Sequence, residues 1–154
     1  MYLRRRPVLI GVASVAGFAG CLAADDEPVD PTVTVADHDA FGSILVDGDG
    51  MALYMFDADE RGAGESTCDG DCAENWPPLE VGMDTQPVPD PAVIAGLSTF
   101  ERPNGNFQVA ANGWPLYYWT GDDEPGEANG QAVNDDWWVL SPDGEPIRET
   151  DAND

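Results

Sequence analysis

The chain has 154 residues, of which 30 are acidic and six are basic, so its formal net charge at pH 7 is −24. This balance excludes nucleic-acid binding through a basic face. A content of 42% hydrophobic residues, with five Trp, four Tyr and five Phe, excludes a wholly disordered acidic polymer. We interpret the acidic residues as a solvated carboxylate surface of the halophile type, because molar salt shortens the Debye length to roughly 3 Å and screens their repulsion.

Residues 1–20 have the pattern of a signal peptide. A cluster of three arginines at 4–6 precedes an apolar run at 8–19, and Gly20 precedes Cys21. The run is too short for a membrane-spanning helix, which needs roughly 20 residues, so the pattern predicts export. Residues 5–9 resemble the twin-arginine export signal.

Cys21 is the predicted lipid attachment site. Residues 18–21 resemble a lipobox, with Phe18 where Leu is usual, and an unmodified thiol is the alternative. Lipidation at Cys21 would anchor the protein to the outer face of the cell membrane. We expect an acidic tether at residues 21–36 and an acidic tail at residues 145–154, because the composition of neither segment allows it to bury much apolar surface. A chain that begins at Cys21 keeps three arginines against 30 acidic residues, a formal charge of −27.

The remaining part, residues 37–144, is organised by an internal repeat. Copies at about 41–79 and 104–140 share the consensus G-x-Φ-x-V-x-x-x-G-x-x-L-Y-x-[FW]-x-x-D, in which Φ is apolar. Residues 75–79 are echoed at 136–140. The motif residues of the two copies are Tyr54, Phe56 and Asp59, and Tyr117, Trp119 and Asp122.

Each copy begins with a strand, a turn and a second strand. Residues 47–50 and 111–113 supply the Asp, Asn and Gly that hairpin turns require. The following strand is apolar on both faces, with Leu53 and Met55 on one and Tyr54 and Phe56 on the other. The pattern predicts an all-β fold, one small antiparallel sandwich- or barrel-like domain built from two related repeats. A short helix is expected only at 91–97, and the adjacent residues Trp137 and Trp138 should face opposite ways.

These segments resemble a known family. Residues 54–59 and 117–122 resemble the Y-x-[FWY]-x-x-D motif of a family of predicted secreted-repeat lipoproteins, and residues 68–79 are similar to its C-x-x-x-C-x-x-x-W-P-P-L segment. The resemblance covers about 100 residues. It implies export, lipid attachment and the repeat, and it implies no established reaction or ligand.

Cys68 and Cys72 are the two thiols that remain if Cys21 is lipidated. In an exported protein they predict a disulfide, which would stabilise the fold by about 2 kcal/mol. A soft-metal site and redox exchange are the alternatives. A blue-copper site needs two histidines, whereas the chain has one, His38, which falls next to the predicted tether.

Asp59 and Asp122 end the two motif copies. Their predicted role is to cap backbone N–H groups where the chain turns, and a cation site at these residues is the alternative. The acidic residues of the first copy do not form an EF-hand, because Arg61 and Cys68 occupy ligand positions.

No catalytic residue is predicted. The sequence lacks a nucleophile elbow, a phosphate-binding loop and a zinc-ligand spacing. The leading hypothesis is an exported, lipid-anchored envelope protein that is a non-catalytic binding or structural module of unknown ligand, with the membrane as its predicted partner and no cofactor. The alternatives are a cation-binding or redox accessory lipoprotein and a small glycan-acting hydrolase, which would need a carboxylate pair.

Overall fold

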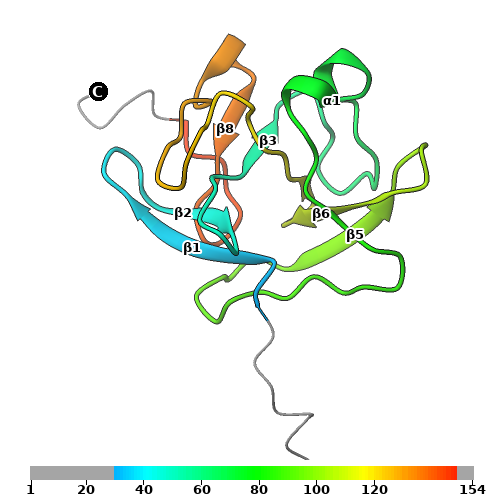
Figure 1. Cartoon of the computed structure of the whole chain (residues 1–154), viewed down its shortest axis with the longest axis horizontal. Coiled ribbons are helices and arrows are strands. Elements are labelled where there is room, and N and C mark those ends of the chain that lie inside the picture. The colour runs from blue at the N-terminus through cyan, green and yellow to red at the C-terminus, as the bar shows by residue number, and fades with distance from the viewer. Residues whose placement is uncertain (1–29, 149–154) are drawn as a thin grey trace, which may run out of the picture.

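The computed structural model describes residues 30–148 (Figure 1). The predicted signal peptide, the lipidation site Cys21, most of the predicted tether and residues 149–154 of the predicted tail lie outside this range. Within residues 30–148, no helix has the length and apolar character needed to cross a membrane.

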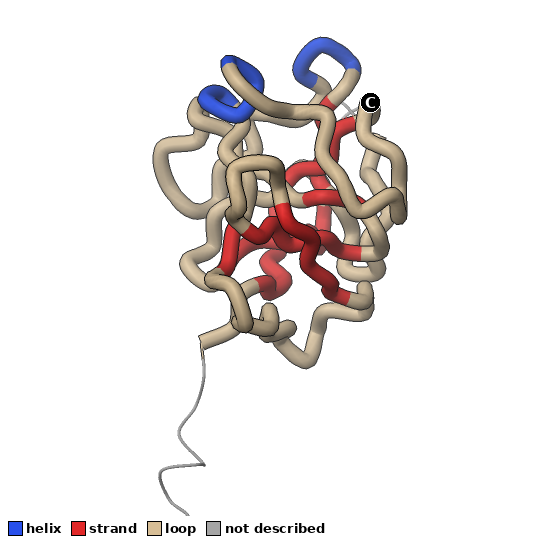
Figure 2. Tube along the Cα trace, turned by 90° about the vertical axis from the view of Figure 1, so that its right-hand side faces the viewer, coloured by secondary structure: helices blue, strands red, loops and turns tan. Residues whose placement is uncertain are grey.

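The fold is all-β. Figure 2 shows the strands in the middle of the molecule and the helical segments at one end. In chain order, the elements are β1 (Val33–His38), β2 (Gly42–Asp47), β3 (Tyr54–Phe56), the helix α1 (Asp71–Asn75), β4 (Glu80–Val81), β5 (Leu97–Glu101), β6 (Phe107–Ala111), β7 (Trp114–Pro115), the 3₁₀ helix η2 (Val133–Asp135) and β8 (Trp137–Val139).

The strands form several small antiparallel sheets, and two of these sheets join the repeats. The β1–β2 and β5–β6 hairpins lie on opposite sides of the view in Figure 1, and the paired strands β3 and β8 lie above them. Strand β3 of the first copy pairs with β8 of the second, and β4 of the first pairs with β6 of the second. The two copies are therefore interlocked rather than placed side by side as separate sheets.

An approximate twofold relation runs through the centre. The backbone N–H of Tyr54 donates to the carbonyl of Tyr117 at 2.9 Å, and the reverse bond measures 3.0 Å. Leu45 N–H donates to the carbonyl of Leu140, and Val109 N–H donates to that of Leu79. Leu45 is thus the structural counterpart of Val109. An ungapped alignment of the copies would pair Val109 with Val46 instead, and the shift of one residue arises because the first copy's turn is one residue longer.

The predicted division of the central strands into two apolar faces is confirmed. Leu53 and Met55 belong to one buried cluster, and Tyr54 and Phe56 pack in another. Trp137 and Trp138 are likewise divided between the clusters. Trp137 is 2% exposed and Trp138 is 7% exposed, so the pair fills both cores.

The folded part of the chain extends beyond the predicted domain boundaries of 37 and 144 at both ends. Strand β1 starts at Val33, which is fully buried, although residues 21–36 were expected to form a tether. Its short alternating pattern becomes a strand because β2 pairs with it along its whole length. At the other end, Ile147 packs against the core and Arg148 forms an ion pair with Asp57.

The helix expected at 91–97 is wrong. The Asp90 carboxylate accepts the N–H of Ala92, which holds a turn, and Ile94 and Ala95 both donate to the carbonyl of Pro142. These long-range bonds use the N–H groups that a helix would need, and β5 begins at Leu97.

Candidate functional site

The tyrosine of each motif copy is hydrogen-bonded to the aspartate of the other copy. Tyr54 Oη donates to Asp122 Oδ2 at 2.6 Å, and Tyr117 Oη donates to Asp59 Oδ2 at 2.6 Å. We call these two interactions the crossed Tyr–Asp pairs. The tyrosine and the aspartate of one motif are therefore not bonded to each other. Each forms its buried hydrogen bond with a residue of the other copy.

The second carboxylate oxygen of each aspartate caps a turn. Asp59 Oδ1 accepts the N–H of Thr67 at 2.7 Å and its hydroxyl at 2.8 Å. Asp122 Oδ1 accepts the N–H of Asn129 at 2.7 Å. Both oxygens of each aspartate therefore accept hydrogen bonds from the protein. Neither aspartate belongs to a group of acidic side chains, among the described residues, that could hold a metal ion.

Burial sets the protonation of the crossed pairs. Burial, reinforced by the Asp122 carboxylate, raises the pKa of Tyr54 far above its ordinary value, and burial with the charge of Asp59 raises the pKa of Tyr117. Both phenols consequently stay protonated and act as donors at any physiological pH. Burial also raises the pKa of Asp122, against the lowering effect of the Tyr54 hydrogen bond.

Four aromatic rings form a continuous stack beside the crossed pairs. The successive ring centroids are 4.1 Å, 3.8 Å and 4.1 Å apart along Phe56, Trp137, Trp76 and Trp119. Tyr54 meets the edge of Trp76, as Tyr117 meets that of Trp137, an arrangement that aromatic pairs favour. The inner rings are buried, so the stack is core and its middle offers no face to a ligand.

A glycine is required where the chain crosses this stack. A Cβ at Gly130 would lie 2.8 Å from the ring of Trp76 and 2.9 Å from that of Tyr54. Its N–H also donates to Tyr54 Oη at 3.0 Å. At Gly130 the backbone of the second copy therefore packs directly against the buried Trp76 and Tyr54 rings.

The disulfide predicted between Cys68 and Cys72 is present, with 5.2 Å between the Cα atoms. It closes the short loop 68–72, and Ser66, two residues before this loop, places its Oγ 2.5 Å from Tyr117 Oη. This loop closes the first copy's side of the centre. Because the two sulfurs are bonded to each other, they are not the thiolates that a soft-metal site needs, whereas redox exchange, the other alternative, itself passes through a disulfide and is not tested by this bond.

Two buried polar residues under this loop were missed by sequence reasoning. Arg102 Nη2 donates to the carbonyl of Cys68 at 2.7 Å, and its Nη1 donates to Gln108 Oε1 at 2.6 Å. Gln108 in turn donates a hydrogen bond from Nε2 to the carbonyl of Leu116. The one signal in the sequence was the scarcity of arginine, which makes each remaining arginine of the domain a candidate for a specific role.

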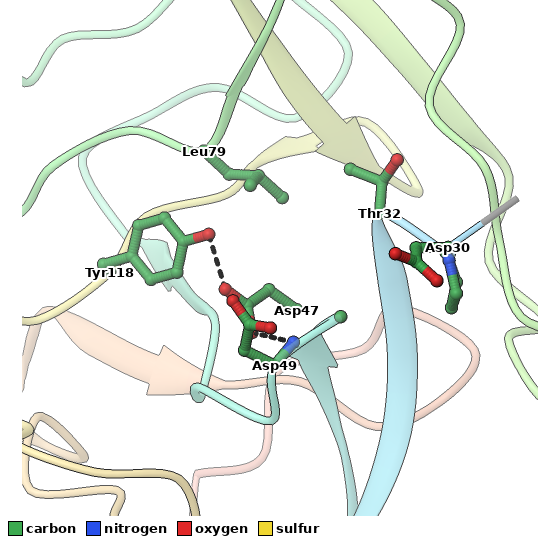
Figure 3. A pocket seen from close by; sticks show the side chains of 8 residues that line it. Asp30, Thr32, Asp47, Asp49, Leu79 and Tyr118 are labelled. Carbon is green, nitrogen blue, oxygen red and sulfur yellow. Dashed lines mark hydrogen bonds between the residues drawn. The ribbon is translucent and has the colours of Figure 1, made fainter.

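An acidic pocket of about 520 Å³ opens beside β2 (Figure 3). Tyr118 Oη donates to Asp47 Oδ2 at 2.8 Å, and Asp47 Oδ1 accepts the N–H groups of Asp49 and Met51. Burial and the neighbouring Asp47 raise the pKa of Tyr118, so it too is a donor. The pocket is lined by Asp30, Pro31, Thr32, Asp47, Gly48, Asp49, Leu79 and Tyr118.

The acidic residues of the first copy are dispersed rather than collected. Asp57 pairs with Arg148, Asp59 with Tyr117, and Asp69 lines a different cavity. Among the described residues, no group of three or more His, Cys, Asp or Glu side chains is placed to hold a metal ion. What the acidic pocket offers chemically is negative charge, because the Tyr118 hydroxyl already donates its proton to Asp47.

Comparison with protein families gives one match, a family described as a secreted repeat of unknown function, at residues 34–80 and 98–141. The two matched segments contain the two motif copies and cover more than half of the chain. No curated protein and no solved structure matches the chain. The chain belongs to this family of secreted repeats, whose function is unknown.

Proposed function

We propose that the protein is an exported, lipid-anchored, non-catalytic module of the cell envelope, in which the repeat motif builds a scaffold. The observation that carries this proposal is the use of the motif itself. Its tyrosines and aspartates are consumed by the crossed Tyr–Asp pairs and by turn caps, and its aromatic rings are stacked in the core. Because these side chains are buried and hydrogen-bonded within the protein, they support the fold, and any ligand would bind to other residues on the surface.

Export and anchoring rest on the sequence before residue 30 and on the secreted family. The arginine cluster, the short apolar run and the lipobox-like residues 18–21 support cleavage at Cys21 and attachment of a lipid. One acyl chain binds a membrane only marginally, whereas two chains anchor a protein stably. The acidic segment that follows would hold the domain away from the membrane surface.

Membrane fractionation tests the anchor. We expect wild-type protein in the membrane fraction and Cys21→Ser either released or uncleaved. Leu22→Ser is the matched control, because it changes the neighbouring residue and keeps the thiol. A Cys21→Ser protein that stays in the membrane fraction at the wild-type mature mass would contradict the anchor at Cys21.

A high-salt environment is part of the proposal. A formal charge near −27 on the mature chain should weaken folding when ionic strength is low, and screening should restore it. We expect a much lower melting temperature in about 10 mM salt than in about 3 M NaCl. A melting temperature that does not change with salt would remove the halophile assignment while leaving the anchor untouched.

Binding of a cationic ligand is a second candidate function, favoured by the three carboxylates of the acidic pocket. Asp49→Asn is the sharpest test, because no hydrogen bond among the described residues uses the Asp49 carboxylate, so the turn should survive. Calorimetric titration with an organic cation, an alkyl diamine, in about 3 M NaCl should give heat that Asp49→Asn reduces and the exposed-site control Asp39→Asn does not. Equal heats for all three proteins would exclude this pocket.

A further inference from the structure

Arg102 is a buried cation without an anionic partner among the residues that the structure describes. It is 5% exposed, and its two hydrogen bonds go to neutral acceptors, the carbonyl of Cys68 and the amide oxygen of Gln108. Within residues 30–148 the one ion pair is that of Arg148 with Asp57, so no described carboxylate oxygen lies within 4.0 Å of the Arg102 guanidinium. A buried charge that lacks a counter-ion is costly.

Arg102 also lines a cavity. Arg102 forms part of the wall of a cavity of about 230 Å³, together with Asp69, Gly70, Ala73, Pro103 and Asn104. The cavity is smaller than the 300–1,000 Å³ typical of drug-sized ligands, but it has room for a few atoms and their water. A guanidinium has five N–H donors, and the two bonds above leave three of them without a partner among the described residues.

We propose that the Arg102 cavity is a binding site for a small carboxylate anion. The planar guanidinium fork fits a carboxylate through two parallel hydrogen bonds, a geometry that a spherical ion cannot use. The anion would supply the missing counter-charge. This site goes beyond the proposed scaffold role and is separate from the acidic pocket, which would take a cation.

The net charge of the chain sets the conditions in which this site is filled. In dilute buffer the negative surface, and Asp69 at the cavity wall, repel an anion. At molar salt that repulsion is largely screened, and a weak site is occupied by mass action. Screening depends on ionic strength alone, whereas a site depends on which anion is present, so the two contributions can be separated.

The experiment compares anions at one ionic strength in the intact mature protein. Thermal melts in sodium formate and in NaCl, each at about 1 M, are paired with the ¹³C line width of labelled formate in the presence of the protein. Ala73→Leu is the blocking variant, because it fills the cavity and leaves Arg102 in place, and Ala58→Leu adds the same group at an exposed site. Asp69→Asn removes the like charge from the wall.

In wild type and in Ala58→Leu we expect formate line broadening. We also expect a melting temperature higher in formate than in chloride by roughly 5 °C when formate is ten times its Kd. Ala73→Leu should abolish both effects, and Asp69→Asn should tighten formate binding several-fold. Comparison with Ala73→Leu cancels the general effect of each salt on solubility.

Three outcomes would overturn the proposal. Absence of formate broadening in wild type would leave Arg102 as a clamp on the Cys68 loop. Loss of stability in Asp69→Asn, equal in both salts and without tighter formate binding, would identify Asp69 as the internal counter-ion. Chloride binding as tight as formate binding would show that the site does not use the carboxylate geometry.

Discussion

The two halves of the domain perform the same task with different closing chemistry. Asp59, at the end of the first motif, caps Thr67, which directly precedes the loop closed by the disulfide. Asp122, at the end of the second, caps Asn129 in a loop without a disulfide, where Gly130 donates directly to a motif tyrosine. The repeat therefore specifies which groups are buried at the centre. The loop of each copy is stabilised by different interactions.

The crossing makes each half depend on the other. Each buried tyrosine takes its carboxylate partner from the opposite copy, and two of the sheets are shared between copies. A half alone would bury an unpaired phenol or carboxylate, which costs free energy. We therefore expect one cooperative unfolding transition for the whole domain, and the following substitutions test how evenly the two halves contribute.

The largest effect should come from the inner rings of the aromatic stack. Trp76→Ala and Trp137→Ala should each lower the free energy of unfolding by about 3–5 kcal/mol, because both remove a large buried side chain from a stack with little room to collapse. Urea denaturation in about 3 M NaCl measures this. Trp119→Ala, at the half-buried end, should cost clearly less, and an equal cost would contradict the picture of a buried middle.

The crossed pairs should show energetic coupling between copies. Tyr54→Phe should lower the free energy of unfolding by about 1.5–3 kcal/mol, because it leaves the Asp122 carboxylate without its donor. A double-mutant cycle with Asp122→Asn should give a coupling energy above about 0.5 kcal/mol. The cycle of Tyr54→Phe with Asp59→Asn, within one motif, should be nearly additive. Stronger coupling within the motif than across copies would overturn the crossing.

The same variant has a predictable pH dependence. Burial already raises the pKa of Asp122 above its ordinary 3.8, and loss of the Tyr54 hydrogen bond, which lowers it, should raise it further. The folded variant then binds a proton more readily than the folded wild type. The destabilisation caused by Tyr54→Phe should therefore be largest at neutral pH and shrink as pH falls through the raised pKa. Destabilisation that grows towards acid pH would contradict this assignment.

The disulfide should contribute to the free energy of unfolding about as much as one crossed pair, through the first copy's loop alone. The double variant Cys68→Ala/Cys72→Ala should lose about 2 kcal/mol, the chain-entropy value for so short a loop. Ala132→Gly is a backbone control in the other copy's loop, where the residue adopts a positive φ that glycine tolerates, so it should not destabilise. Mass spectrometry without reduction should show the wild-type peptide two hydrogens lighter than its dithiol form.

The smallest effect should come from the exposed end of the fold. Arg148 holds the pKa of Asp57 below its ordinary 3.8, so this pair adds stability above that pH and loses it as pH falls through the lowered pKa. Both side chains are substantially exposed, so Arg148→Ala should cost less than about 1 kcal/mol. Its cost should fade in acid. A loss of several kcal/mol would show that Arg148 matters mainly through its contact with the Trp138 ring.

Much of the fold was predictable because it depends on local patterns. Alternation of apolar residues placed Leu53 and Tyr54 on opposite faces, and both lie in the expected cores. Strand β1 was not foreseen at its true start, because residues 33–36 become a strand only through pairing with β2. The expected helix at 91–97 was wrong for a related reason, since its N–H groups bond to a carbonyl at Pro142.

The sequence by itself determined the repeat, the all-β class and the two faces of the central strands. These follow from spacing along the chain, which sets which face a side chain takes and which groups can meet. Only the tertiary structure decided that Tyr54 meets Asp122 and Tyr117 meets Asp59, across 68 and 58 residues, and that Arg102 is buried. The physical reason is that the burial of a polar group depends on partners brought together by the whole fold, and local sequence carries no record of them.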